Sequence, residues 1–150
     1  MNPPFVKVFV CGTPVGQPRP RARRFKDRVI IYDPKTAKPW REAVSSTVAR
    51  AVDTPRSGPL ELVMTFQLPR PKSHYGTGKN KDLVKKSAPQ FHSQKSDIDN
   101  IIKSTLDAMN GVLYKDDAQV SKITAQKVWA DFPELAGLAL EARTLELLED

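Results

Sequence analysis

Alternating apolar and polar positions predict four strands along the chain. The run Val6–Cys11 is apolar enough for a buried strand, and residues 120–129 and 137–145 also have strand character. In residues 60–68 every second side chain is apolar, so one face of a strand carries Leu60, Leu62, Met64, Phe66 and Leu68. Such strands need a second layer that covers their apolar face.

Two longer stretches have the period of an amphipathic helix. The first is residues 36–52, whose apolar side is formed by Trp40, Ala43, Val44, Val48 and Val52. Pro39 fits this helix because it falls in the first turn, where a missing N–H loses no intrahelical bond.

The second helical pattern begins at Ile98. Its apolar face is formed by Ile98, Ile101, Ile102, Thr105 and Met109, and its polar face by Asp99, Asn100, Lys103 and Asp107. Lys103 is four residues from each of two carboxylates, so we expect it to lie between Asp99 and Asp107. Gly111 follows the periodic run and is expected to cap the helix.

Two segments lack such patterns and are predicted to be loops. Three prolines between residues 12 and 28 exclude a regular helix, so we expect an extended loop there. A short strand or hairpin arm over Arg28–Tyr32 and a turn at Asp33-Pro34 follow. Residues 69–96 are also irregular, with a single helical turn over Lys81–Lys86. The elements together predict one α/β domain over residues 1–150, with one mixed sheet and two main helices packed on it.

Composition is typical of a soluble globular domain, with 39% hydrophobic and 27% charged residues. No apolar run reaches the roughly 20 residues that cross a membrane, and the first residues lack the pattern of a signal peptide. We therefore expect a cytoplasmic protein with no membrane partner. The single cysteine, Cys11, allows no internal disulfide and is expected to be buried in its strand.

Positive charge gathers in the two loops of a chain whose net charge is +7. Six Lys or Arg stand against one acid between Gln17 and Arg28, and seven against one between Arg70 and Lys95. Arginine suits bidentate phosphate contacts, so these segments indicate a polyanionic partner. The two histidines, His74 and His92, fall in the second loop and are expected to be polar loop residues, His92 being the better functional candidate.

Acidic residues gather instead between residues 95 and 120, at Asp97, Asp99, Asp107, Asp116 and Asp117. Residues two apart in a helix point about 200° apart, so Asp97 and Asp99 converge only if Asp97 is the N-cap. The residues alone leave two interpretations open. The aspartates serve as helix caps and turns, or they hold a divalent cation beside a phosphate at the helix N-terminus.

The residues around these aspartates form a specific motif. It reads Ser96-Asp-Ile-Asp-Asn100, then Lys103, Asp107-Ala108, Gly111 and Asp116-Asp-Ala-Gln-Val120. This motif resembles the signature of the RusA family of Holliday-junction resolvases, the crossover junction endodeoxyribonucleases. The resemblance implies a Mg²⁺-dependent endonuclease, with Mn²⁺ as a substitute, that acts as a homodimer on four-way DNA junctions. Such enzymes serve DNA recombination and repair, usually in phage or prophage settings.

The resemblance also assigns roles to residues. Asp97, Asp99 and Asp117 match the family's metal-binding catalytic acids, and Lys103 matches its essential lysine. Asp116 is an auxiliary candidate, and Asp107 is expected to hold Lys103 in place. The candidate DNA contacts are Arg19, Arg21, Arg23, Arg24, Lys95, Asn100 and Lys127.

The basic segment 69–96 is longer than in the compact family pattern, so the DNA path over it does not follow from the resemblance. Two other functions stay open. One is a basic DNA-binding module whose aspartates only cap and turn, and the other is a branched-DNA nuclease without junction preference. Metal-dependent cleavage separates the module from both nucleases, and symmetric nicking of a junction separates the two nucleases.

Overall fold

Four strands form a mixed sheet at the centre of the structure. The computed structural model describes residues 5–18, 20–32 and 35–146. The strands lie in the order β1-β6-β4-β5. Their bounds are Phe5–Cys11 for β1, Leu60–Leu68 for β4, Val120–Trp129 for β5 and Gly137–Thr144 for β6. Strand β6 is antiparallel to both β1 and β4, whereas β4 and β5 are parallel.

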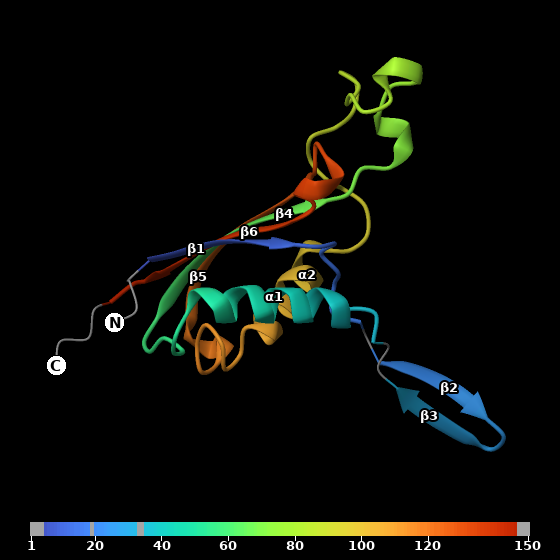
Figure 1. Cartoon of the computed structure of the whole chain (residues 1–150). Coiled ribbons are helices and arrows are strands. Elements are labelled where there is room, and N and C mark those ends of the chain that lie inside the picture. Colours follow the sequence, from blue (N-terminus) through green and yellow to red (C-terminus); the bar gives the residue numbers. More distant parts are fainter. Residues whose placement is uncertain (1–4, 19, 33–34, 147–150) are drawn as a thin grey trace.

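Two helices lie on one face of this sheet (Figure 1). Helix α1 spans Lys38–Ala51 and α2 spans Ile98–Ala108. The indole Nε1 of Trp40 in α1 donates a 3.1 Å hydrogen bond to Thr105 Oγ1 in α2, which links the helices. One mixed sheet with two main helices packed on it is therefore confirmed, in one compact α/β domain. No helix in the described ranges has the length and apolar character needed to cross a membrane.

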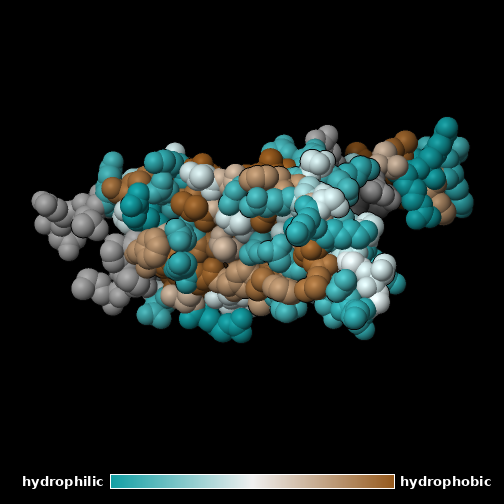
Figure 2. Space-filling view, turned by 90° about the horizontal axis from the view of Figure 1, so that it is seen from above, coloured by the Kyte–Doolittle hydropathy of each residue, from teal (hydrophilic) through white to brown (hydrophobic). Residues whose placement is uncertain are grey.

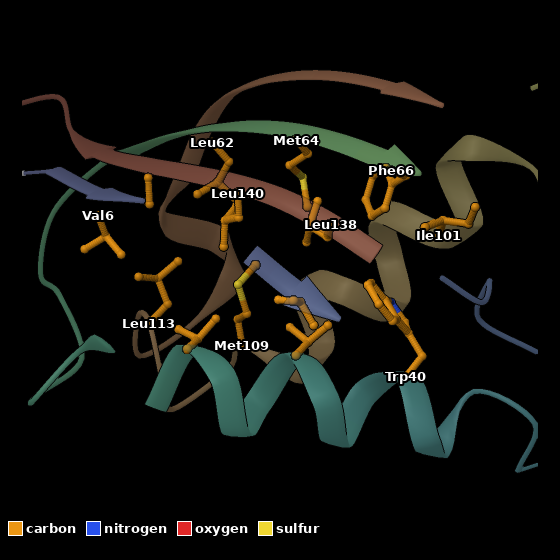
Figure 3. Packing of buried hydrophobic residues seen from close by; sticks show 14 of the residues in the cluster. Val6, Trp40, Leu62, Met64, Phe66, Ile101, Met109, Leu113, Leu138 and Leu140 are labelled. Atoms are coloured by element: carbon orange, nitrogen blue, oxygen red, sulfur yellow. The ribbon is translucent and has the colours of Figure 1, made fainter. Parts of the chain in front are cut away.

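The core lies between the sheet and the helices and is built from the predicted faces. All five alternating apolar residues of β4 are buried. From α1, the side chains of Trp40, Val44 and Val48 are buried against the sheet. Met109 and Leu113, in the turn after α2, fill the space between the two layers (Figure 3).

The connection from β4 to β5 determines where α2 begins. After Leu68 the chain runs through the long basic segment and α2 and returns parallel to β4, so that Leu68 pairs with Trp129. The segment follows this edge of the sheet on its way. The Trp129 N–H donates to the Gln90 carbonyl at 2.8 Å, and the His92 N–H donates to the Lys127 carbonyl at 3.2 Å. The residues that lead into α2 are thus held beside the carboxyl ends of β4 and β5.

The face of the sheet opposite the helices is mixed in character. Seen from above in Figure 2, it has apolar patches, in brown, among polar ones in teal. Phe5 and Phe9 of β1 are partly exposed. Glu61 of β4 forms ion pairs with Lys122 of β5 and Arg143 of β6. The hydrogen bond from Lys122 is the largest of the effects that lower the pKa of Glu61, and these ion pairs join three strands on this face.

The prediction of an extended loop over residues 12–28 is wrong for the end of that segment, where the chain forms a hairpin. Strand β2 (Arg21–Phe25) pairs antiparallel with β3 (Arg28–Tyr32), and Lys26 in the turn between them has a φ of 54°. β3 is the predicted arm, whereas β2 has no apolar alternation that would reveal it. The hairpin extends away from the sheet and helices (Figure 1), which leaves exposed Phe25, Val29, Ile30 and Ile31. The turn predicted at Asp33-Pro34 lies outside the described residues.

Two local predictions about burial and helical turns are also wrong. Cys11 is exposed, because successive side chains of a strand point to opposite faces and Val10 takes the buried position. Residues 81–86 form no helical turn. The short 3-10 helices of this segment are Lys72–His74 and Gly78–Asn80.

The predicted cap at Gly111 is wrong because α2 ends earlier. The helix stops at Ala108 with Met109 as its C-cap, and the Met109 N–H donates to the Leu106 carbonyl at 3.1 Å. Gly111, with a φ of 75°, belongs to the turn that follows. Its N–H donates to the Tyr114 carbonyl at 2.8 Å, which starts the return of the chain toward β5.

Candidate active site

The start of α2 presents two carboxylates that are not used to cap the helix. Asp97 is the N-cap, as predicted, with φ −66° and ψ 144°, but its side chain makes no capping hydrogen bond. Its backbone carbonyl accepts the Ile101 N–H at 3.1 Å. Asp99 lies in the first turn, and both aspartates are exposed. Side-chain capping therefore does not account for Asp97, and the metal-binding role predicted for both carboxylates stays a prediction.

Lys103 continues the exposed face of α2. Its Nζ lies 3.6 Å from Asp107 Oδ2, which agrees with the expectation that Asp107 holds it. The described ranges contain no ion pair between Lys103 and Asp99, so the expected position between two carboxylates is correct on one side only. At 1.5 Å per residue, Lys103 is about 6 Å along the helix axis from each of them. The Lys103 side chain is well exposed.

Asp116 and Asp117 are neighbours with different surroundings. Asp116 Oδ1 accepts the Ala118 N–H at 2.8 Å and caps the short 3-10 helix Asp117–Gln119. Gln119 Oε1 completes this capping box by accepting the Asp116 N–H at 3.2 Å. The backbone N–H of Asp117 donates to Asn110 Oδ1 at 2.9 Å. Asp116 is thus the turn residue of the pair, and the role of Asp117 as a metal ligand stays a prediction.

Three residues that were not assigned from the sequence hold this turn in place. Asn110 binds the Asp117 backbone, and the buried Tyr114 donates its hydroxyl to the Leu106 carbonyl at 2.7 Å. Gln119 Nε2 donates to the carbonyls of Arg56 and Gly58 at 2.9 and 3.0 Å, which anchors the turn to the start of β4. The Gln119 contact had a signal, since Asp followed by Gln three residues later is a capping-box pattern.

Negative charge is crowded around Asp117. Desolvation is the main cause that raises its pKa, followed by the hydrogen bond and charge of Asp116 and the charge of Asp107, while Lys103 acts in the opposite direction. The pKa of Tyr114 is also raised, chiefly by burial and then by the charges of Asp117, Asp107 and Asp116. One lysine faces three carboxylates here, so a bound cation would relieve the repulsion.

The structure brings Asp117 beside Asp107 and Lys103, whereas Asp97 and Asp99 lie at the N-terminal end of α2. Among the residues that the structure describes, no three His, Cys, Asp or Glu side chains are already arranged around one metal position. Mg²⁺ commonly takes one or two carboxylates and completes its shell with water and substrate phosphate oxygens. The hard carboxylate oxygens fit this ion, and their assignment to one metal centre stays a prediction.

Lys127 of β5 holds the segment that precedes Asp97. Its ammonium donates to the Gln94 carbonyl at 2.9 Å and to the Ser96 carbonyl at 2.7 Å. In the parallel pairing Lys127 lies opposite Phe66, which is buried in the core, so it is on the helix-covered face of the sheet. Two of the three ammonium protons of Lys127 are therefore used in hydrogen bonds within the protein. The contact of Lys127 with DNA stays a prediction.

The start of the first basic segment packs against the other side of α2. The Gln17 N–H donates to the Asn100 carbonyl at 2.9 Å, and Ser104 Oγ donates to the Val15 carbonyl at 2.6 Å. Gly16 lies between these two contacts, and a Cβ there would come within 3.0 Å of Asn100 Cβ. The chain that leads to the basic hairpin therefore starts beside the candidate site.

The other predicted DNA contacts occupy exposed segments. Arg23 and Arg24 are exposed on the hairpin, and Lys95 is exposed just before α2. Arg19 and the side chain of Arg21 lie outside the described residues. The structure thus brings Lys95 and Asn100 near the candidate site and places the described arginines on an arm.

A further group of cations was not predicted. Lys35, Lys38 and Arg41 line a pocket of about 510 Å³ at the start of α1, together with Gln17 and with Glu42, which pairs with Lys38 at 3.8 Å. Lys38 and Arg41 lie in the first turn of α1, and Lys35 lies just before it. Because Gln17 is bonded to Asn100, this basic surface adjoins the polar face of α2.

Comparison with known families bears directly on this arrangement. A sequence model of the family described as "Endodeoxyribonuclease RusA" matches residues 12–136, which include α2 and all the predicted metal-binding acids. The chain belongs to the RusA endodeoxyribonuclease family. RusA proteins are nucleases that act on branched DNA, so the resemblance of the motif to this family is confirmed.

A curated relative extends the same similarity over nearly the whole chain. The "Uncharacterized protein YqaN" of Bacillus subtilis (strain 168) is 30% identical over 131 residues, which cover 87% of this chain and 92% of that protein. The similarity therefore takes in the hairpin and the long basic segment as well as the RusA motif.

Proposed function

We propose that this RusA-family protein is a Mg²⁺-dependent endodeoxyribonuclease that resolves four-way DNA junctions by symmetric hydrolysis of two phosphodiester bonds. The observation that carries the proposal is the exposed side of α2 and the turn that returns to it. Asp97 and Asp99 present carboxylates there that do not cap the helix, Lys103 presents an ammonium, and Asp117 is crowded by like charges. In a chain of net charge +7, such a group suits a cation while the remaining surface attracts DNA.

Each residue has a chemical task in this proposal. Mg²⁺, when bound by Asp97, Asp99 and Asp117, supplies charge neutralisation and an activated water. Lys103, steadied by Asp107, stabilises the negative charge that develops on the scissile phosphate. The N-terminus of α2 directs backbone N–H groups and the positive end of its dipole toward the same phosphate.

The DNA arms are bound by the basic surfaces that flank α2. These are the hairpin with Arg23 and Arg24, the exposed Lys95, and the cations that line the pocket at the start of α1. The protein acts as a symmetric homodimer, because a four-way junction has two strands to cut at related positions. Family membership and the symmetry of the substrate support this part of the proposal.

The test is cleavage of an end-labelled four-way junction in Mg²⁺ or in EDTA, with the nicks mapped on each strand. We expect paired nicks at symmetry-related positions in Mg²⁺ and none in EDTA. Asp97→Asn, Asp99→Asn and Asp117→Asn should each lower the rate by about 10²-fold or more. Asp53→Asn removes an exposed acid beyond the end of α1 and should cleave like the parent.

Binding measured in EDTA adds an independent check. Without metal the acids repel phosphate, so Asp99→Asn should bind a junction at least as tightly as the parent does. Full cleavage by Asp117→Asn, or cleavage in excess EDTA, would contradict the metal-dependent mechanism. Binding without cleavage would identify a basic DNA-binding module, and equal cutting of flaps and junctions a branched-DNA nuclease without junction preference. A monomer by light scattering, both free and junction-bound, would exclude the homodimer.

A further inference from the structure

A pocket of about 420 Å³ opens at the carboxyl ends of β4 and β5. Leu68 and Trp129 contribute apolar walls, and Lys95 and Ser96 form the side that leads into Asp97. Ligands of open α/β sheets bind beyond the carboxyl ends of the parallel strands, often in pockets of this size. Because consecutive Cα atoms are about 3.8 Å apart, the wall at Ser96 adjoins the first of the predicted metal-binding acids.

Two buried side chains that line this pocket each have one nitrogen without a partner. The Arg70 side chain is 4% exposed; its Nη1 donates to the Pro89 carbonyl at 2.8 Å and its Nη2 to Asp131 Oδ1 at 3.2 Å. Its Nε has no partner among the described residues. His92 is 8% exposed, and its Nδ1 likewise has none. Buried polar nitrogens are normally paired. Both of these atoms are shielded from solvent, so a small shift of either side chain is needed before a partner from outside the chain can pair with it.

The imidazole of His92 packs against a tryptophan, and its surroundings lower its pKa. Its ring packs on Trp129 with 4.3 Å between the centroids. Desolvation and then the charge of Lys127 lower the pKa of His92, so at neutral pH its ring offers one donor and one acceptor. His74 touches the same indole edge-on at 4.9 Å, but its Nδ1 is 3.2 Å from Arg70 Nη1 and it does not line the pocket. His92 therefore has an unpaired ring nitrogen, whereas the same nitrogen of His74 is bonded to Arg70.

We propose that this pocket receives one nucleotide of the DNA, unstacked from its neighbours, beside the phosphate that is cut. The inference rests on the proposed function, because it places that phosphate at Asp97. The apolar wall suits a base, the unpaired nitrogens of Arg70 and His92 suit its polar edge, and Lys95 suits the phosphate. Unstacking costs least at a branch point, where a base already lacks one stacking neighbour. A phosphate alone would leave the apolar wall unused.

The first test measures ligand binding in the pocket and involves no DNA cleavage. The full chain is titrated in EDTA with each deoxynucleoside 5′-monophosphate and with inorganic phosphate, and the indole N–H signals are followed by NMR. The chain has two tryptophans, of which Trp129 lines the pocket and Trp40 is bonded to Thr105 in the core. We expect at least one mononucleotide, at about millimolar concentration, to shift the Trp129 signal and leave the Trp40 signal unchanged. Inorganic phosphate should shift neither.

Three variants decide whether the pocket is responsible. His92→Phe keeps a ring against Trp129 but removes the unpaired nitrogen, and should weaken mononucleotide binding about tenfold. Thr13→Tyr fills the pocket from its exposed rim without touching the core and should have the same effect. Lys122→Met is the control, because Lys122 lies on the same strand as Trp129 but pairs with Glu61 away from the pocket, and this variant should bind like the parent. The proposal is overturned if no mononucleotide shifts Trp129, if phosphate alone does so, or if His92→Phe and Thr13→Tyr bind like the parent.

Junction cleavage separates this inference from the proposed function. In Mg²⁺, His92→Phe should raise the KM for a junction several-fold and leave the Mg²⁺ concentration for half-maximal rate unchanged. A parent that binds mononucleotides but cuts no DNA would refute the proposed nuclease while supporting the nucleotide pocket. A parent that cuts junctions and binds no mononucleotide would refute the pocket alone.

Discussion

Replacing Lys127 by methionine tests how the candidate site is held together. Lys127→Met keeps the apolar stem of the side chain and removes the ammonium that donates to the Gln94 and Ser96 carbonyls. The segment that positions Asp97 would lose its anchor to β5. We expect the rate of junction cleavage to fall about ten- to thirtyfold, because small displacements of catalytic groups cost large factors in rate. Junction affinity should change little.

The magnitude follows from the two hydrogen bonds. A hydrogen bond from a charged group contributes about 1.5–3 kcal/mol when it is well buried. Lys127 is only half-buried and Gln94 is exposed, so water replaces part of each bond after the substitution. About 2 kcal/mol then holds the segment, which corresponds to roughly a thirtyfold shift toward displaced positions. This sets the upper end of the expected loss.

The assay combines single-turnover cleavage of a labelled junction with two measurements on the free protein. Amide hydrogen exchange at Ile101, whose N–H donates to the Asp97 carbonyl, should become faster. The pKa of His92, which the charge of Lys127 helps to lower, should rise in an NMR titration. Lys122→Met is the matched control, since Lys122 lies on the same strand but pairs with Glu61.

The results also distinguish positioning from DNA contact. If Lys127 binds a phosphate, Lys127→Met should weaken junction binding in EDTA and reduce the log–log salt slope by about 0.9. That outcome, with unchanged exchange at Ile101, would assign the residue to DNA binding. A parent-like cleavage rate in Lys127→Met, or an equal loss in Lys122→Met, would refute the reasoning altogether.

Three further predictions concern stability and packing around the same helix. The pKa of Asp117 is raised in the folded state, so the free energy of unfolding falls as the pH rises from the ordinary pKa of 3.8 through the raised value. Asp117→Asn should therefore raise the Tm near pH 7 in the absence of metal. At about pH 3, where the carboxyl is protonated in both states, the substitution should give no gain. Thr105→Val leaves the indole N–H of Trp40 unpaired and should cost about 1–3 kcal/mol in urea unfolding, whereas Thr105→Ser should not. Gly16→Ala would bring a Cβ within 3.0 Å of Asn100 Cβ, so it should displace this loop and lower the cleavage rate several-fold without unfolding the chain by circular dichroism.

Periodicity predicted the layers of this protein because burial leaves a regular trace in the sequence. The alternation along β4 and the apolar face of α2 each follow from one local geometry. The N-cap position of Asp97 was also predictable, since two acids two residues apart converge only at a helix start. The resemblance to the RusA motif then assigned the metal-binding role to three of these acids, and that assignment stays a prediction.

The remaining features depend on contacts between distant residues or on backbone angles. The carbonyls that accept from Lys127 are 33 and 31 residues away in the sequence, so no local sequence pattern predicts these contacts. Asp116 and Asp117 are identical in type and adjacent, and only the backbone decides that the first one caps the turn. Cys11 lies in an apolar run of the sequence, which predicts that it is buried. Only the alternation of side chains along the strand places it on the exposed face.

The hairpin has a consequence for how this protein can change in evolution. None of its described side chains belongs to the hydrophobic core, and a two-stranded hairpin by itself is only marginally stable in water. If the hairpin binds DNA as proposed, part of the binding free energy is used to order it. Substitutions on this arm should therefore leave the folding of the sheet and helices intact, so the proposed DNA contacts of the hairpin can change without loss of the fold.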